Sequence, residues 1–434
     1  MASQGSAPTR VLLASLVGSS IEWFDYFLYG TVAALVFTKL YFPAHDPVVS
    51  LLLTYLTFAL PFFIRPLGGA VFAHIGDRIG RKKSLIYTLM LMGVGTALIG
   101  VLPTYQSVGV WAPAMLITLR LIQGLGIGGE WGAAVLLAYE YAPPHRRGLY
   151  GSIPQMGVTV GMLLSTLCIG AVSLLPDAAF MQWGWRVPFL LSFALVALGL
   201  WIRLGINETP AFAQAKAEGR QVKLPLVSVF KWHWREVLIA VFAKMVETGP
   251  FYIFTVFVIG YATQTLGYTR SAALNAVAIG ALTSTLTIPL AGRLSDRVGR
   301  ATLFLIGCAV MALFAPLYFM VLEQRSNLLL IVATVLAMAV VWPMVTATLS
   351  TLMSELFRTE VRYTGISLGY QIGAALVGGT APLLATWILA VDSGSWRWIA
   401  GYMVLTALLS AIAVLCAGRR HAAQQAAAVQ AIKA

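Results

Sequence analysis

The amino-acid sequence predicts an all-α membrane protein, and three observations support this prediction. First, 59% of the 434 residues are hydrophobic and only 10% are charged, whereas a soluble globular protein carries about 25% charged residues. Second, the apolar runs are long enough for helices that cross a bilayer, which need ~20 residues, and they are longer than the strands of about 10 residues that form a membrane barrel. Third, a charged loop sequence occurs in both halves of the chain. Together they predict twelve transmembrane helices arranged as two pseudo-symmetric six-helix bundles.

The apolar runs define two sets of six expected spans. In the first half they cover residues 11–37, 48–73, 84–102, 110–140, 148–175 and 187–205. In the second half they cover residues 236–261, 272–292, 301–322, 328–354, 365–391 and 396–417. The expected organisation is an N-terminal six-helix bundle over 1–205, a cytoplasmic linker over 206–235, a C-terminal six-helix bundle over 236–417 and a cytoplasmic tail over 418–434.

Most of the 29 Lys and Arg residues fall in alternate connecting segments. Cytoplasmic loops carry an excess of Lys and Arg, so this distribution places both chain ends inside the cell. The net charge of +13 is then a feature of membrane topology, and nucleic acid is not an expected partner. The polar start leads into a long first span with acids at its centre, so we expect this helix to be retained and not cleaved as a signal peptide.

The first span contains two carboxylates, Glu22 and Asp25, near its centre. A spacing of three places both on one face of a helix. An ionisable group at this depth is costly, so it is expected to face a protein interior or a water-filled cavity. We therefore interpret the pair as functional, in preference to the alternative of a structural polar pair at a helix contact.

A helix rises 1.5 Å per residue, and on this scale further ionisable residues lie at or near the same depth: Arg65, Arg120, Glu130, Lys244 and Glu247. Arg203 stands at a helix end, where its long side chain is expected to reach water. The spans then hold four acids against three bases, so one acid lacks a cationic partner and should be easy to protonate. The candidates for this proton-binding role are Glu22, Asp25 and Glu130.

The basic residues and nearby aromatic rings suggest a second role, because Arg and Lys can bind a carboxylate and rings can wall a cavity. The candidates for substrate binding are Arg65, Arg120, Lys244, Glu247, Tyr26, Tyr252, Trp342 and Tyr370. Alternatives remain open at several of these positions. Glu130 lies in a glycine-rich run where a structural role is equally well supported, and Lys244 and Glu247 are spaced to neutralise each other on one helix face.

A charged loop motif occurs twice in the chain. Gly76-Asp-Arg-Ile-Gly-Arg-Lys82 lies between the second and third spans, and Gly292-Arg-Leu-Ser-Asp-Arg-Val-Gly-Arg300 lies between the eighth and ninth. A fainter repeat places an acid and an arginine after the fourth span, Glu140 and Arg147, and again after the tenth, Glu355 and Arg362. Parallel repeats of this kind are typical of transporters whose substrate site lies near mid-membrane at the repeat interface.

These motifs resemble the major facilitator superfamily over nearly the whole chain. The run Arg120-Leu-Ile-Gln-Gly-Leu-Gly-Ile-Gly-Gly-Glu130 is similar to a second motif of that superfamily. Four further runs resemble its metabolite:proton symporter family: Glu22-Trp-Phe-Asp25, Arg65-Pro-Leu-Gly68, Gly-Gly-Glu130-Trp-Gly132 and Trp183-Gly-Trp-Arg-Val-Pro188. The chain departs from the family pattern at Ala73, where a glycine is usual, and this puts in doubt only the closeness of one helix contact.

The resemblance implies proton-coupled import of a small organic acid by alternating access, in a bacterial inner membrane. Members of the family carry shikimate, α-ketoglutarate, citrate, or proline and betaine. The expected partners are an organic anion, protons and membrane lipids; a monomer without cofactor, metal or enzymatic activity is expected. The alternatives are a zwitterion symporter and a proton-driven exporter or facilitator. A transporter-like sensor is less well supported because the longest soluble stretch is 206–235.

The resemblance also implies a cytoplasmic gate at the repeated loops, formed by Asp77, Arg78, Gly80, Arg81, Glu140, Arg147, Asp296, Arg297, Gly299, Arg300, Glu355 and Arg362. Glycine permits a tight turn in these loops, and Asp77 can face the positive end of a helix. Arg147 and Arg362 are expected to pair with the loop acids and latch the two halves in one state. The alternative is that the basic residues only enforce topology, and both statements can hold together.

Overall fold

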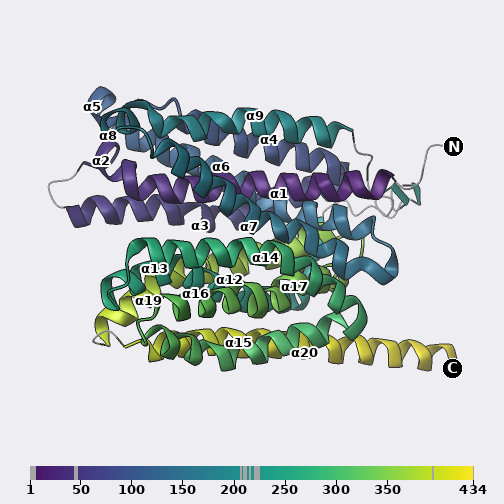
Figure 1. Cartoon of the computed structure of the whole chain (residues 1–434). Helices are drawn as coiled ribbons and strands as arrows, with labels where there is room; N and C mark the ends of the chain where they lie inside the picture. Colours follow the sequence, from purple (N-terminus) through teal and green to yellow (C-terminus); the bar gives the residue numbers. More distant parts are fainter. Residues whose placement is uncertain are drawn as a thin grey trace. The chain divides into compact units, whose positions relative to one another are not determined.

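The computed structural model describes residues 6–43, 47–205, 208, 213–214, 217–218, 225–392 and 395–433. In this part of the chain all regular structure is helical (Figure 1). Twelve helical spans are long and apolar enough to cross a membrane, and each of the twelve predicted spans coincides with one of them. The predicted fold class is therefore confirmed. Most of the predicted linker before residue 225, and the side chains of the predicted tail, lie outside the described residues.

The chain forms two compact units: Met1–Pro143 with Ile153–Pro225, and Pro144–Ser152 with Leu226–Ala434. The limits predicted for the two bundles stay a prediction. The first unit contains the elements α1 (Ser6–Val32), η1 (Ala33–Phe37), α2 (Thr38–Leu40), α3 (Pro47–Ile79), α4 (Arg81–Ile99), α5 (Tyr105–Val108), α6 (Trp111–Glu140), most of α7 (Arg147–Val172), α8 (Asp177–Ala179), η3 (Phe180–Gly184) and α9 (Arg186–Leu204). 

The second unit begins with the short helix η2 (Pro144–Arg146) and the first residues of α7. Its other elements are α11 (Pro225–Trp232), α12 (Trp234–Tyr252), η4 (Ile253–Phe257), α13 (Val258–Gly260), η5 (Tyr261–Thr265), α14 (Arg270–Val298), α15 (Arg300–Leu322), α16 (Asn327–Leu336), η6 (Ala337–Val341), α17 (Trp342–Leu356), α18 (Arg362–Val377), α19 (Thr380–Val391) and α20 (Arg397–Lys433). Helix α20 continues beyond the predicted end of the last span at residue 417.

Close packing of α3 against α6 explains the glycines of the motif on the fourth span. A Cβ atom at Gly124 would overlap Pro61, and one at Gly68 would overlap the carbonyl of Leu125. Small residues let helix backbones approach each other in a membrane, where packing and not the hydrophobic effect holds helices together. Helix α6 also packs on α1 and α4, and α9 packs on α1 and α4. Helices α4, α6 and α9 therefore surround the middle of α1, where the two predicted carboxylates lie.

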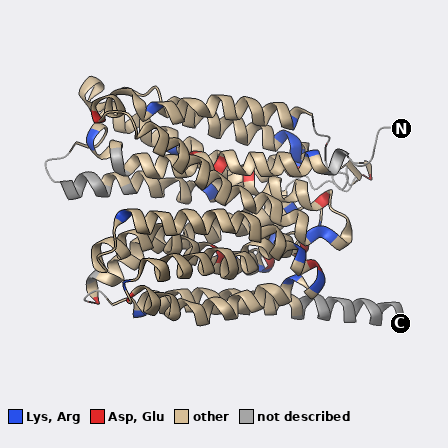
Figure 2. Cartoon of the chain, viewed as in Figure 1, with Lys and Arg blue, Asp and Glu red and all other residues tan. Residues whose placement is uncertain are grey.

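Charged residues are concentrated at the repeated loops. Figure 2 shows helices that are uncharged along most of their length, with Lys and Arg gathered near the turn from α3 to α4 and the turn from α14 to α15. Each turn has a glycine with positive φ, Gly80 at 115° and Gly299 at 93°. Glycine adopts this conformation without a steric penalty, so both copies of the motif use it to turn the chain between two helices.

Candidate functional site

The carboxylate of Asp25 on α1 is buried, with 1% of the residue exposed. Thr96 of α4 donates a hydrogen bond to Oδ2 at 2.7 Å, and Ser192 of α9 donates one to Oδ1 at 2.6 Å. Among the residues that the structure describes, no Lys or Arg forms an ion pair with Asp25. A buried charge normally has a charged partner, so this carboxylate is an exception: each oxygen is satisfied by a neutral hydroxyl group.

A chain of hydrogen bonds leads from this carboxylate to Arg120 on α6. Gln123 donates from Nε2 to the Thr96 hydroxyl at 2.7 Å and accepts at Oε1 from Nη1 of Arg120 at 2.9 Å. The guanidinium of Arg120 is 0% exposed, lies 3.6 Å from the ring centroid of Tyr29 and donates from Nε to the Thr57 carbonyl at 3.2 Å. The structure thus joins two predicted site residues through Thr96 and Gln123, which the sequence analysis did not select.

Arg65 on α3 is a buried cation of another kind. Its guanidinium carbon lies 4.8 Å from the ring centroid of Tyr26 and 4.4 Å from that of Phe62. Within the described part of the chain, the guanidinium has no ion pair and no hydrogen-bond acceptor, and its Nε atom is buried without a partner. Aromatic faces compensate part of the charge, but the five N–H donors are left for a ligand of suitable geometry.

Glu22, the other acid of the first span, is buried on α1 one turn before Asp25, and 3% of it is exposed. The candidate Tyr26 follows Asp25 directly and is 1% exposed. Its ring contacts those of Phe58 and Phe62, at centroid distances of 5.0 and 5.6 Å. The middle of α1 therefore brings together acids and aromatic rings beside α3.

Glu130 on α6 is paired with Arg203 of α9, which donates to both carboxylate oxygens. Thr88 donates a further hydrogen bond to Glu130 at 2.6 Å. The expectation that Arg203 reaches water is wrong, because only 2% of it is exposed. The predicted surplus of one acid depended on leaving this arginine out. Gly18 of α1 faces the pair so closely that a Cβ atom there would overlap the Arg203 guanidinium. A glycine at position 18 was the one sign of this pair in the sequence of α1.

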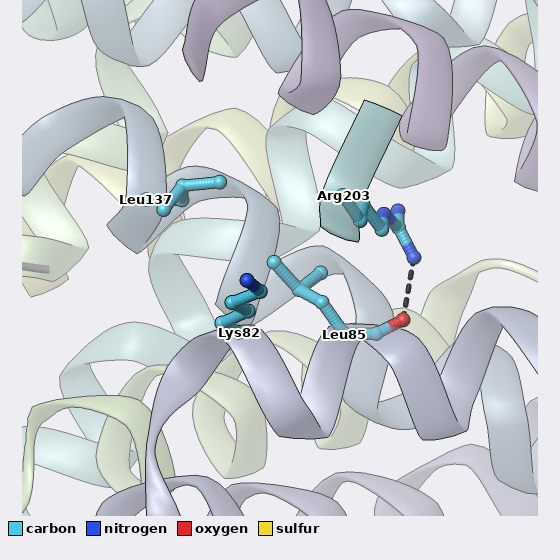
Figure 3. A pocket seen from close by; sticks show the side chains of 4 residues that line it. All are labelled: Lys82, Leu85, Leu137 and Arg203. Carbon is cyan, nitrogen blue, oxygen red and sulfur yellow. Dashed lines mark hydrogen bonds between the residues drawn. The ribbon is translucent and has the colours of Figure 1, made fainter. Parts of the chain in front are cut away.

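A small hollow lies beside this ion pair. Its walls are formed by Lys82, Leu85, Leu137 and Arg203, and Arg203 donates to the Leu85 carbonyl (Figure 3). The Lys82 ammonium donates to the Leu204 carbonyl at 2.9 Å. The basic groups around the hollow are therefore engaged with main-chain acceptors at the ends of α4 and α9.

The second unit holds a compact charged cluster on α12, α17 and α18. Lys244 and Glu247 form a buried ion pair, and the Lys244 nitrogen lies 3.5 Å from the ring centroid of Tyr370. Glu247 also accepts a hydrogen bond from Thr346 at 3.1 Å, and its main-chain carbonyl accepts one from Trp342 at 2.8 Å. This carboxylate is therefore held by a cation as well as by neutral donors.

Two further aromatic residues of α12 belong to the same region. Phe251 stacks on Trp342 with ring centroids 4.7 Å apart, and the candidate Tyr252 is buried with 2% exposure. Stacked rings keep their geometry at little cost in side-chain entropy. All the predicted substrate residues of the second half thus lie on or against α12.

The first repeated loop carries a buried ion-pair cluster. Arg81 lies 3.3 Å from Asp77 and 3.9 Å from Glu140, and 1% of Arg81 is exposed. Glu208 accepts hydrogen bonds from the main-chain nitrogens of Arg81 and Lys82, at 3.1 and 3.3 Å. A carboxylate at the first turn of a helix is stabilised by the helix dipole, so Glu208 takes the place at α4 that we expected for a loop aspartate.

The second loop repeats the pattern within the second unit. Arg300 lies 3.3 Å from Asp296 and 3.1 Å from Glu355. Asp296 accepts hydrogen bonds from the main-chain nitrogens of Gly148 and Leu149, at 2.7 and 2.9 Å, in the first turn of α7. Arg81 and Arg300 thus contact the loop acids, and the pairing expected for Arg147 and Arg362 stays a prediction. Of the remaining basic residues in the predicted gate, Arg78 and Arg297 are exposed, and Arg147 and Arg362 are half-buried.

Comparison with known proteins places these features in a family. The family model described as sugar (and other) transporter matches residues 11–224, and that of the major facilitator superfamily matches residues 248–433. The shikimate transporter of Escherichia coli is 37% identical over 94% of each chain. The chain belongs to the major facilitator superfamily. Within the superfamily it is a member of the metabolite:proton symporter family, as its motifs predicted.

Other relatives support the same assignment. The inner membrane metabolite transport protein YhjE of Escherichia coli is 40% identical over 87% of each chain. The proline/betaine transporter of the same organism is 32% identical over 93% of this chain and 82% of that protein. Among solved structures, the proton:xylose symporter XylE has a TM-score of 0.75 at 19% identity and covers 95% of each chain, which shows a shared fold. This superfamily member is a multi-pass inner-membrane transporter and not an enzyme.

Proposed function

We propose that this transporter is a proton-coupled symporter that imports a small organic acid by alternating access. The observation that carries the proposal is the environment of Asp25, a buried carboxylate that accepts hydrogen bonds from the hydroxyls of Thr96 and Ser192. A proton can bind to such a group without breaking an ion pair, so the loaded and unloaded states both keep a satisfied hydrogen-bond set. Arg120 acts on Asp25 from one side through Gln123.

Arg65 is the first candidate for the substrate anion in this proposal. Only 3% of Arg65 is exposed, and its guanidinium lies on two rings, without an acid partner in the described chain. A planar fork of donors binds a carboxylate in a bidentate manner. A mono-, di- or tricarboxylate, or a hydroxy acid such as the shikimate that gives one relative its name, fits this cation.

One observation favours a zwitterion as the second candidate. Lys244 and Glu247 present both signs of charge within one turn of α12, next to the Tyr370 ring. An ammonium group is attracted to aromatic faces and to carboxylates, and several relatives are named for proline and betaine. An exporter or a facilitator on the same fold differs in the direction or the coupling of transport, not in these residues.

The proposal includes the expected orientation and gate. Both termini lie on the cytoplasmic side by the distribution of Lys and Arg, and the clusters around Arg81 and Arg300 form and break as the transporter changes state. The proposed gate is supported by a contact pattern that occurs at both loops: one arginine lies close to two acids. A monomer is proposed as the working unit.

The test is uptake by the purified protein in liposomes, with shikimate, α-ketoglutarate, citrate, proline and glycine betaine as labelled probes. Each probe is measured with and without an imposed inward proton gradient. Accumulation of one organic acid only in the presence of the gradient supports the proposal. Accumulation of proline or betaine would select the zwitterion, and equilibration that ignores the gradient would replace symport with facilitation.

A further inference from the structure

The hydroxyl group of Thr96 stands between the proposed proton-binding carboxylate and the rest of the buried polar cluster. Two acceptors lie within reach of its single hydrogen: Oδ2 of Asp25 at 2.7 Å and the main-chain carbonyl of Met92 at 3.0 Å. Gln123 donates to the same hydroxyl oxygen at 2.7 Å. A hydroxyl donates one hydrogen and accepts two, so Thr96 has two orientations that each use its hydrogen.

The other hydroxyl at the carboxylate has one orientation. Ser192 lies 2.6 Å from Oδ1 of Asp25, and among the described residues this is its only hydrogen-bond partner. A proton on Oδ1 would take away the acceptor of the Ser192 hydrogen, and an unmade hydrogen bond at a residue with 0% exposure costs free energy. A proton on Oδ2 avoids this cost because the Thr96 hydrogen has the Met92 carbonyl as a second acceptor.

We propose that Thr96 is a positioning residue that transmits the protonation state of Asp25 to Gln123 and Arg120, by turning its hydroxyl between the carboxylate and the Met92 carbonyl. The inference rests on the proposed function, because it takes Asp25 as the group that binds the coupling proton. Thr96 lies outside the motifs quoted above, and its place between Asp25 and Gln123 selects it for this role.

The two states differ in a defined set of bonds. When Asp25 is ionised, Thr96 donates to Oδ2 and accepts from Gln123. When a proton delivered by water binds Oδ2, the new O–H group donates to the Thr96 oxygen, and the Thr96 hydrogen turns to the Met92 carbonyl. The Thr96 oxygen then accepts two hydrogen bonds in place of one. The O–H bond on Asp25 forms as an O–H bond of the hydronium ion that delivers the proton breaks, and the rotation of the Thr96 hydroxyl breaks no covalent bond.

This change reaches Arg120 by two routes. After protonation, the Thr96 oxygen accepts from the new Asp25 O–H group as well as from Nε2 of Gln123. Oε1 of the same Gln123 amide accepts from the Arg120 guanidinium at 2.9 Å. A change in the first bond therefore changes the second. The Coulomb attraction between Asp25 and Arg120 also disappears. Among the helices that pack against Asp25, α6 supplies a charged group, Arg120. Helices α4 and α9 supply the hydroxyls of Thr96 and Ser192 to the carboxylate. Glu22 is the further acid on α1 itself.

The experiment follows the carboxylic-acid C=O band of Asp25 by infrared difference spectroscopy during a pH titration of the full-length protein in phosphatidylcholine vesicles. The variant Asp25→Asn identifies the band. We expect Thr96→Val, which keeps the shape and removes the hydroxyl, to shift the band, and Thr96→Ser to restore it. The matched control is Thr118→Val, because among the described residues the Thr118 hydroxyl bonds only to the Ala114 carbonyl one turn away.

Transmission is tested by the midpoint pH of the same band in a double-mutant cycle. We expect Gln123→Met to move the midpoint when Thr96 is present and to leave it unchanged in the Thr96→Val background. Equal shifts in both backgrounds, or an unchanged band in Thr96→Val, would overturn the inference. If Thr96→Val does not fold, Thr96→Ala serves in the same cycle.

The two proposals fail separately. If Asp25→Asn leaves both the titrating band and gradient-driven uptake intact, the proposed function is wrong at its proton site. If Asp25→Asn removes both while Thr96→Val behaves as the wild-type protein, Asp25 keeps its role and only the transmission through Thr96 is excluded. A Thr96→Val protein that exchanges substrate but no longer accumulates it supports the inference, since a purely structural hydroxyl would lower both activities together.

Discussion

Asp25 in the first unit and Glu247 in the second are buried carboxylates at the middle of their helices, yet they are held differently. Asp25 accepts hydrogen bonds from two hydroxyls, whereas Glu247 forms an ion pair with Lys244 on its own helix and accepts further bonds from Thr248 and Thr346. An adjacent cation stabilises the ionised form of an acid; neutral hydroxyls can serve both forms. This difference in partners is why we propose Asp25, and not Glu247, as the group that binds and releases the coupling proton.

The largest expected effect tests this contrast directly. Asp25→Asn should reduce gradient-driven accumulation to the equilibrium level while exchange of substrate across the membrane persists, because an amide cannot take up the coupling proton. Glu247→Gln is the matched change in the second unit and should leave the response to the proton gradient in place. Uptake and exchange in liposomes give both readouts. If the two variants lose coupling equally, the contrast between the units is wrong.

The second effect is on stability. Lys244→Met should lower the free energy of unfolding by roughly 3–5 kcal/mol, because it leaves the buried Glu247 carboxylate without its cation. The double variant Lys244→Met with Glu247→Met removes both charges and should recover most of the loss. Thermal unfolding in detergent measures both. A single variant as stable as the wild-type protein, or a double variant no better than the single one, contradicts the interpretation of this pair as fixed charges.

The third prediction concerns Arg65, the cation that we propose for the substrate. Arg65→Gln should weaken binding of an organic acid by about 10- to 100-fold, since a hydrogen bond to a charged group contributes about 1.5–3 kcal/mol. Arg65→Lys keeps the charge without the planar fork and should fall in between. Equilibrium binding of the acid found in the uptake panel is the measurement. An unchanged dissociation constant in Arg65→Gln would leave Lys244 as the cation to examine.

The smallest expected effect concerns the support of the second cluster. Trp342→Phe should lower the free energy of unfolding by about 1 kcal/mol, because it removes the hydrogen bond to the Glu247 carbonyl and keeps a ring against Phe251. Trp387→Phe is the control, since 63% of Trp387 is exposed and no effect is expected. Equal losses in the two variants would show that Trp342 contributes through bulk alone.

Local sequence patterns determined much of this protein. The number of spans follows from the apolar runs. Within the bilayer, backbone N–H and C=O groups must form hydrogen bonds inside the segment, so each long apolar run becomes one helix. The turns at Gly80 and Gly299 follow from a motif that repeats, and the depth of Asp25 follows from the rise of a helix. Arg65 was selected for the same reason, since a charge within an apolar run stands out against its neighbours.

Only the tertiary structure decided which side chains meet. Thr96 and Ser192 come from helices that are distant along the chain, and a hydroxyl in an apolar run is too common to mark a site. Arg203 was misjudged because its position at a helix end says nothing about the acid facing it from α6. Periodicity defines depth and face within one helix, but the neighbours of that face depend on how glycines and side-chain shapes pack the helices together. The partners of each buried charge are therefore a property of packing, and they distinguish Asp25, whose partners are hydroxyls, from Glu247, which has a cation beside it.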